Sequence, residues 1–125
     1  MLQKALISGI SVIYYGEEIG MVDAEISYED TMDPWGCNCG PINYVNCSRD
    51  PARTPMQWNR AKNSGFSQAA TTWLPVNDNY KEINLDSQEM EDYGHWFNIK
   101  TLLSLRKNGE DLHHGEVHIS LLHGG

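Results

Sequence analysis

Two arginines stand close together in the segment Ser48–Trp58, whose sequence is SRDPARTPMQW. A guanidinium group carries N–H donors in a rigid planar fork, which suits the recognition of carboxylates and sugar hydroxyls. Arg49 and Arg53 are therefore candidate substrate-binding residues. The alternative is that either side chain only ties its loop down, through Asp50 or backbone carbonyls, and for Arg53 this structural interpretation is the preferred one.

Two adjacent acids, Glu17 and Glu18, follow an apolar run. Successive side chains on an extended segment point in opposite directions, so the pair cannot flank one scissile bond. We expect them to hydrogen-bond neighbouring loops. Asp23 is a third candidate for a substrate contact, and its alternative is a solvated surface position. Trp58 and Trp73 have faces that suit a sugar ring, although pinning a long loop is their preferred role.

The three cysteines, Cys37, Cys39 and Cys47, lie within eleven residues. Cys-x-Cys plus one more, with no histidine nearby, is poor zinc spacing, so no metal site is predicted. A disulfide between Cys47 and either Cys37 or Cys39 is the better interpretation. Asn46-Cys47-Ser48 also fits the N-glycosylation pattern, which would place a glycan on Asn46. Both features favour an oxidising, secretory compartment.

The bulk composition is that of a globular protein, with 125 residues, 40% hydrophobic and 21% charged. The net charge of −8 repels phosphate backbones, which argues against nucleic acid as a partner. No apolar run reaches the roughly 18 residues that span a bilayer. A signal peptide is not visible, and membrane anchoring is left open.

The pattern of elements predicts an incomplete α/β architecture. Residues 2–8 resemble a helix end that stops at Gly9, and 10–15 form an apolar, β-branched strand typical of a parallel sheet. A loop opens after Gly16, and from about 22 to 88 there is little sustained periodicity. We expect a helix over 89–107, capped by Asp92 and stopped by Gly109, and a last strand over 116–122.

Six collinear blocks carry a family resemblance: VIYYGEEIGM, SRDPARTPMQW, NSGFS, TWLPVN, NYKEIN and LLSLRK. Together with TMDPWGCN they resemble the α-glucosidase branch of glycoside hydrolase family 13, and most closely the insect-type maltases. The resemblance implies a fragment of a (β/α)8 barrel, namely its last strand, a long loop and its last helix. Residues 1–109 would end the barrel, and 110–125 would begin an all-β carboxyl-terminal domain.

The same resemblance implies a retaining mechanism with an Asp nucleophile, a Glu acid/base and a second Asp. All three lie upstream in the family, and the Asn-His-Asp segment is missing here, so no catalytic carboxylate is assigned. The fragment alone should be inactive. The resemblance favours Arg49 as the residue that helps to hold the terminal glucose. No cofactor is implied.

The expected substrates of the parent are maltose-like or sucrose-like sugars, and its expected location is secreted or on the extracellular surface. The alternative function is the non-enzymatic ectodomain of an amino-acid transporter heavy chain, which resembles this family over the same blocks. Such ectodomains tend to lose the SRDPAR segment, which is intact at 48–53.

Overall fold

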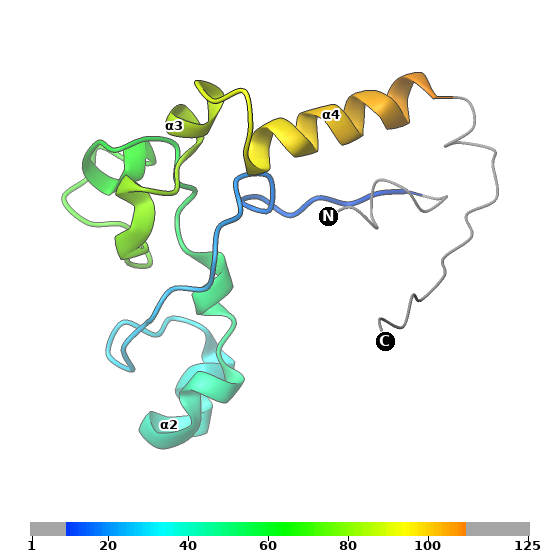
Figure 1. The fold of residues 1–125 in the computed structure, drawn as a ribbon. Coiled ribbons are helices and arrows are strands. Elements are labelled where there is room, and N and C mark those ends of the chain that lie inside the picture. The colour runs from blue at the N-terminus through cyan, green and yellow to red at the C-terminus, as the bar shows by residue number, and fades with distance from the viewer. Residues whose placement is uncertain (1–9, 110–125) are drawn as a thin grey trace, which may run out of the picture.

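The computed structural model describes residues 10–109. The predicted helix end at 2–8, its stop at Gly9 and the strand at 116–122 lie outside this range. The described helices are α2 (Pro34–Cys47), α3 (Leu85–Glu89) and α4 (His95–Asn108), joined by short 3-10 turns at Asp50–Arg53, Lys62–Gly65 and Asp78–Lys81. Helices α2 and α4 lie at opposite ends of the molecule (Figure 1).

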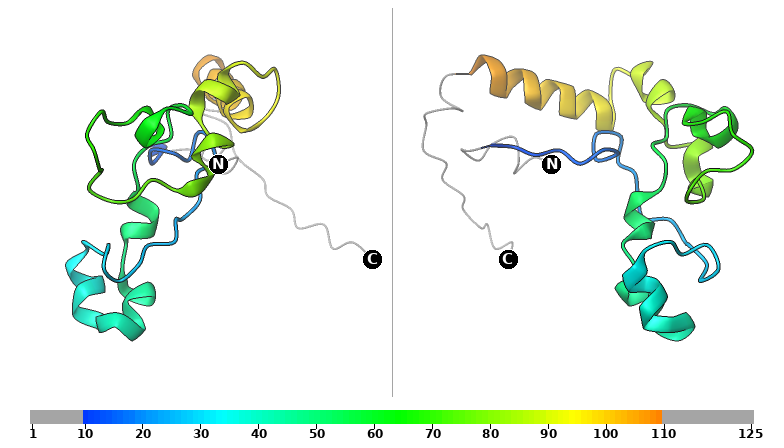
Figure 2. Two further views of the ribbon diagram at one scale, coloured as in Figure 1. Left: turned by 90° about the vertical axis from the view of Figure 1, so that its left-hand side faces the viewer. Right: turned by 180° about the vertical axis from the view of Figure 1, so that it is seen from behind.

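The prediction of a strand over residues 10–15 is wrong for the chain as it stands, since no strand is found anywhere in 10–109. Ile10 is 97% exposed and Val12 is 72% exposed, so this apolar run has no covering surface. A strand needs a neighbouring strand to pair its N–H and C=O groups. No such neighbour exists among the described residues, and the segment runs as a single extended strip (Figure 2).

The predicted face of α4 is largely confirmed. Ile99 is buried, while Trp96, Leu102 and Arg106 are half-buried on the same side of the helix. Leu103, expected on this face, is instead 39% exposed. The predicted stop at Gly109 is confirmed, because its N–H donates to the carbonyl of Leu105 at 2.8 Å.

The prediction of Asp92 as the amino cap of α4 is wrong. The helix begins at His95, and the cap position is Gly94. The φ of Gly94 is 109°, a backbone conformation that favours glycine because it has no β-carbon. The side chain of Gln88 in α3 supplies the missing acceptor, because its Oε1 accepts from the Trp96 N–H at 3.1 Å. A helix can therefore begin here without a capping side chain of its own.

The irregular stretch 16–88 contains more helix than the sequence predicts, chiefly α2. Asp33 caps this helix through its side chain and Pro34 occupies the first turn. The helix is kinked at Gly40, where φ is 74° and ψ is 171°, directly before Pro41. The kink interrupts the 3.6-residue period, which explains why no apolar stripe predicts this helix.

Buried polar side chains hold the rest of the loop together. Gln57, Ser64 and Asn84 are fully buried. The Gln57 amide donates to Asn79 Oδ1 at 3.0 Å, and Ser64 Oγ donates to the Met56 carbonyl at 3.0 Å. Because the described part has few buried apolar side chains, these hydrogen bonds provide much of the stabilisation that an apolar core usually provides.

Candidate functional site

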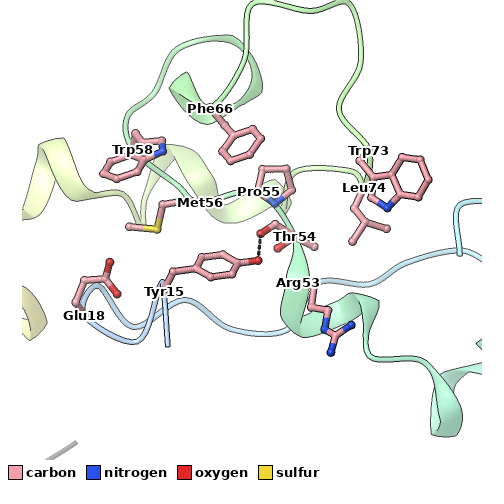
Figure 3. Close-up of a pocket in the computed structure, with 10 residues that line it drawn as sticks. All are labelled: Tyr15, Glu18, Arg53, Thr54, Pro55, Met56, Trp58, Phe66, Trp73 and Leu74. Carbon is pink, nitrogen blue, oxygen red and sulfur yellow. Dashed lines mark hydrogen bonds between the residues drawn. The ribbon is translucent and has the colours of Figure 1, made fainter. Parts of the chain in front are cut away.

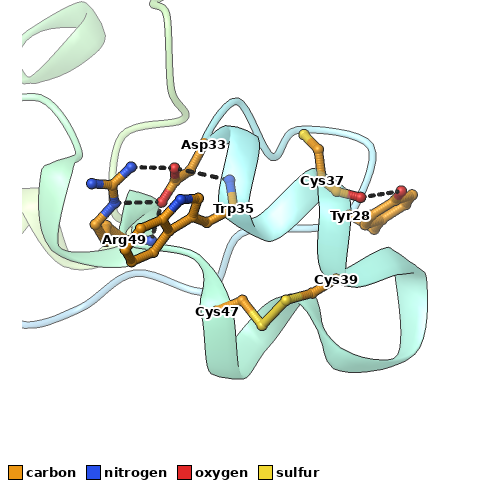
Figure 4. The surroundings of a disulfide bond; sticks show 7 residues. All are labelled: Tyr28, Asp33, Trp35, Cys37, Cys39, Cys47 and Arg49. Carbon is orange, nitrogen blue, oxygen red and sulfur yellow. Dashed lines mark hydrogen bonds and ion pairs between the residues drawn. A yellow bond between two sulfur atoms is a disulfide. The ribbon is translucent and has the colours of Figure 1, made fainter.

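The side chain of Arg49 is fixed by Asp33, sixteen positions earlier in the chain (Figure 4). Nε donates to Asp33 Oδ2 at 2.8 Å, and Nη2 donates to Oδ1 at 2.6 Å. The Arg49 backbone N–H adds a third bond to Oδ2 at 2.8 Å. The guanidinium carbon also lies 4.8 Å from the centre of the Trp35 ring. The fork is thus held in one plane and in one orientation.

This pairing moves the pKa of both groups. The hydrogen bonds from Arg49 hold the pKa of the Asp33 carboxyl well below its usual range, against the opposing effect of burial. The Asp33 carboxylate in turn raises the pKa of Arg49. The Asp33 side chain is 1% exposed and that of Arg49 is 46% exposed, so the charged pair has one buried partner and one partner that faces solvent.

A second carboxylate, that of Asp50, supports the first. Asp50 is 4% exposed, and its Oδ2 accepts from the backbone N–H groups of Met32 at 2.7 Å and Asp33 at 2.8 Å. Its own N–H donates to Ser48 Oγ at 3.2 Å. Asp50 therefore sets the backbone from which the Asp33 side chain reaches Arg49.

An open apolar cavity of about 490 Å³ is lined in part by the RTPMQW segment (Figure 3). Aromatic rings dominate its wall, with Arg53 towards one end and Glu18 towards the other. Its lining consists of Tyr15, Glu18, Arg53, Thr54, Pro55, Met56, Trp58, Phe66, Trp73 and Leu74.

The polar groups of this cavity differ in how they are satisfied. The Tyr15 hydroxyl donates to the Thr54 carbonyl at 2.9 Å, and partial burial raises the pKa of Tyr15 to about 12, so it stays protonated. Glu18 Oε2 is buried and has no hydrogen-bond partner among the described residues. The cavity is thus lined by rings and by two charged residues, Glu18 and Arg53, and the Arg53 guanidinium points away from the rings (Figure 3).

The structure separates the three predicted substrate-binding residues. Arg49 lies in the ion pair with Asp33, and Arg53 lines the aromatic cavity. Asp23 is exposed and is neither in this ion pair nor in the lining of this cavity. Its neighbours tie it to two loops: Asn77 Nδ2 donates to the Val22 carbonyl at 3.1 Å, and the Ala24 N–H donates to the Pro51 carbonyl at 3.0 Å. The expected bonds of the two adjacent acids to neighbouring loops are not confirmed: Glu17 Oε2 accepts from the Tyr14 N–H at 3.2 Å within its own turn, and Glu18 Oε2 has no partner among the described residues.

The structure distinguishes between Cys37 and Cys39 as the disulfide partner of Cys47. Cys39 is bonded to Cys47, and Cys37 is a free, exposed thiol whose Sγ lies 3.4 Å from the Thr31 carbonyl oxygen. Asn46, the predicted glycosylation site, is exposed in the last turn of α2.

The partners of Arg49, Asp33 and Trp35, are not predicted by the sequence. The Asp33-Pro34 pair is a recognisable helix start, with a capping residue followed by proline at the first helical position. That signal predicts where α2 begins, although it does not predict which arginine the cap will also bind.

Residues 10–109 offer neither a metal-binding cluster nor a membrane-spanning helix. Residues 10–109 contain no group of three or more His, Cys, Asp or Glu side chains placed to hold a metal ion. Within the same range, no helix combines the length and the apolar character that a bilayer crossing requires.

Comparison with known proteins places this geometry in context. Residues 1–115 match the family profile for the α-amylase catalytic domain. The chain is 52% identical over 104 residues to an α-glucosidase of Apis mellifera. The matched region covers 82% of this chain and 18% of the relative. It is 48% identical over 112 residues to a salivary α-glucosidase of Aedes aegypti, covering 90% of this chain and 19% of the relative.

Solved structures agree with these relatives. The trehalulose synthase MutB of Pseudomonas mesoacidophila MX-45 superposes with a TM-score of 0.81 at 26% identity, over 89% of this chain and 22% of that one. The trehalose-6-phosphate hydrolase of Bacillus licheniformis superposes with a TM-score of 0.80 at 29% identity, over 90% and 23%.

The chain therefore spans about a fifth of the length of the relatives that it matches. Its predicted fold, a fragment of a (β/α)8 barrel, is supported by these neighbours, although the predicted strand is not formed. The predicted resemblance is confirmed, because the profile match extends over most of the residues. This chain belongs to the α-amylase family of glycoside hydrolases.

Proposed function

We propose that the whole protein is an α-glucosidase that removes terminal, non-reducing α-1,4-linked glucose with retention of configuration. The supporting observation is the identity of about half of the residues to insect α-glucosidases over most of this chain. The candidate substrates are maltose-like and sucrose-like sugars. The catalytic carboxylates would be supplied by residues outside this segment.

In this proposal Arg49 is the substrate-binding residue and Asp33 positions it. Asp33 occupies Nε and Nη2, and no hydrogen-bond partner of Nη1 is found in residues 10–109. The side chain is 46% exposed, so its remaining donors can reach a sugar hydroxyl. Fixing the fork in advance lowers the entropy lost on binding.

Arg53 is proposed as a second, weaker contact. Its place beside aromatic rings suits a sugar with one apolar face, but a role in holding the loop fits equally well. Asp23 remains a candidate for a substrate contact, because it is exposed and the N–H of the next residue, Ala24, donates to the carbonyl of Pro51, which lies between the two arginines, at 3.0 Å.

We also propose secretion of the whole protein, because two of the relatives carry the name salivary α-glucosidase. Residues 1–109 would end the barrel, and 110–125 would begin an all-β domain. The relatives named above are glucosidases, which favours the enzyme over the transporter-subunit alternative.

The test uses the full-length protein that carries this segment. It should hydrolyse maltose and release glucose that is initially the α-anomer, measured by proton NMR. Absence of maltose hydrolysis would contradict the proposed activity. The 125-residue chain alone should show no turnover, and any turnover by it would contradict the view that the reacting acids lie elsewhere.

Matched variants test the two arginines. Arg49→Lys keeps the charge but loses the fork, so kcat/KM on maltose should fall about 10- to 100-fold, as expected for a lost hydrogen bond to a charged group. Arg53→Lys should change kcat/KM less than about threefold. Equal losses would reverse the assignment of roles.

A further inference from the structure

The glycosylation sequence Asn46-Cys47-Ser48 overlaps the disulfide Cys39–Cys47, because Cys47 belongs to both. We infer that Asn46 can receive a glycan only before this disulfide closes, so that the closing of Cys39–Cys47 ends the period in which the site is a substrate. The inference concerns the maturation of the chain and does not rest on the proposed hydrolysis.

The acceptor pattern requires an asparagine and a hydroxyl two positions later. On an extended backbone, side chains at i and i+2 lie on the same side, so an enzyme can engage both. On a helix, side chains at i and i+2 do not face each other. Asn46 and Cys47 are the last two residues of α2, so the folded segment separates the Asn46 amide from the Ser48 hydroxyl.

The folded chain also engages the hydroxyl residue itself. The Ser48 N–H donates to the Tyr44 carbonyl at 2.8 Å, which continues the helical bonding, and Ser48 Oγ accepts from the Asp50 N–H at 3.2 Å. A β-carbon added to Gly36 would lie 2.7 Å from the Ser48 β-carbon, so the serine is packed directly against α2. In the folded state the Ser48 side chain is therefore half-buried and its hydroxyl oxygen is already engaged, which disfavours its use by a modifying enzyme.

The disulfide determines whether this segment stays helical. The kink at Gly40 and Pro41 leaves only seven residues, 41–47, in the second part of α2. Helices of this length are marginal in water without further support. Cys39 and Cys47 bracket these residues, with their α-carbons 6.5 Å apart, so the bond ties both ends together. Without it, residues 46–48 can extend.

The two reactions are chemically independent but share this segment. In glycosylation, the Asn46 amide nitrogen bonds to the anomeric carbon of a lipid-diphosphate-linked oligosaccharide; the lipid diphosphate leaves and the nitrogen loses a proton. In disulfide formation, the two thiols lose two protons and two electrons to a disulfide-bearing oxidant by exchange. Asn46 is exposed in the folded chain, so a glycan added first does not prevent the later bond.

The experiment is translation of the chain, fused to a cleavable signal peptide, in the presence of endoplasmic-reticulum microsomes. Glycan occupancy is read from the mobility shift that an endoglycosidase removes, and this readout does not depend on enzymatic activity. We expect partial occupancy of the unaltered sequence. When dithiothreitol keeps the thiols reduced, the ratio of glycosylated to unglycosylated chain should rise at least twofold. Asn46→Gln and Ser48→Ala should both abolish the shift.

Two matched cysteine variants test whether the disulfide limits glycosylation. Cys39→Ser should raise occupancy to the level seen with dithiothreitol, and the reductant should then have no further effect. Cys37→Ser removes a thiol that is outside the disulfide and should behave as the unaltered chain. Equal occupancy in all three sequences, whether complete or absent, would overturn the inference, as would a rise in Cys37→Ser equal to that in Cys39→Ser.

Discussion

Replacing Asp50 by alanine should release the loop that positions Arg49. The Asp50 carboxylate is 4% exposed and accepts two backbone N–H groups, those of Met32 and Asp33. Its removal leaves both donors without a partner, and each buried, unsatisfied group costs about 1–3 kcal/mol. For the two donors together, the expected local destabilisation is therefore about 2–6 kcal/mol.

The assay is amide hydrogen exchange of residues 28–38 in the full-length protein, followed by mass spectrometry. Since about 1.4 kcal/mol corresponds to a tenfold change in an equilibrium constant, these amides should exchange about 30-fold faster or more. Asp50→Asn keeps one oxygen acceptor and should show a smaller increase. Asp92→Ala is the control, because Asp92 is exposed, and its effect should stay within about 0.5 kcal/mol. Unchanged protection in Asp50→Ala would refute this account of the loop.

Three further perturbations test the same region. Gly36→Ala should destabilise the protein by about 1–3 kcal/mol in urea unfolding, because the new β-carbon would meet neighbouring side chains at 2.7 and 2.8 Å; an unchanged midpoint would contradict this packing. Asp33→Asn should remove a stabilisation that is present above the pKa of the carboxyl in the unfolded chain and is lost as pH falls through its lowered pKa in the folded chain. The melting temperatures of the variant and the unaltered protein should therefore differ near neutral pH and converge in strong acid. A constant difference at all pH values would exclude a role for the charge pair with Arg49. Cys39→Ser should cost about 2.5 kcal/mol, from the loop-closure entropy of an eight-residue separation, whereas Cys37→Ser should cost less than 1 kcal/mol; a reversed order would argue against the observed pairing.

Local signals predicted local features well. The spacing of Trp96, Ile99 and Leu102 predicted the buried side of α4, and Gly109 predicted its end, because both depend only on residues within a few turns of one another. The start of α4 was mispredicted because Gln88, which belongs to another helix, supplies the acceptor that a capping side chain would otherwise provide.

Features that depend on distant residues were not predictable in this way. The partner of Arg49 is sixteen residues away, and nothing in the SRDPAR segment identifies Asp33 as that partner. The two alternatives for Cys47 were equal on spacing alone, and only the fold of α2 distinguishes Cys39 from Cys37.

The strip formed by residues 10–15 has a practical consequence for anyone who handles this chain in isolation. It offers exposed β-branched and aromatic side chains and has no pairing strand among residues 10–109, the combination that promotes intermolecular cross-β association. Copies of the 125-residue polypeptide should adhere to one another through this strip and sediment at concentrations where a closed barrel would remain in solution.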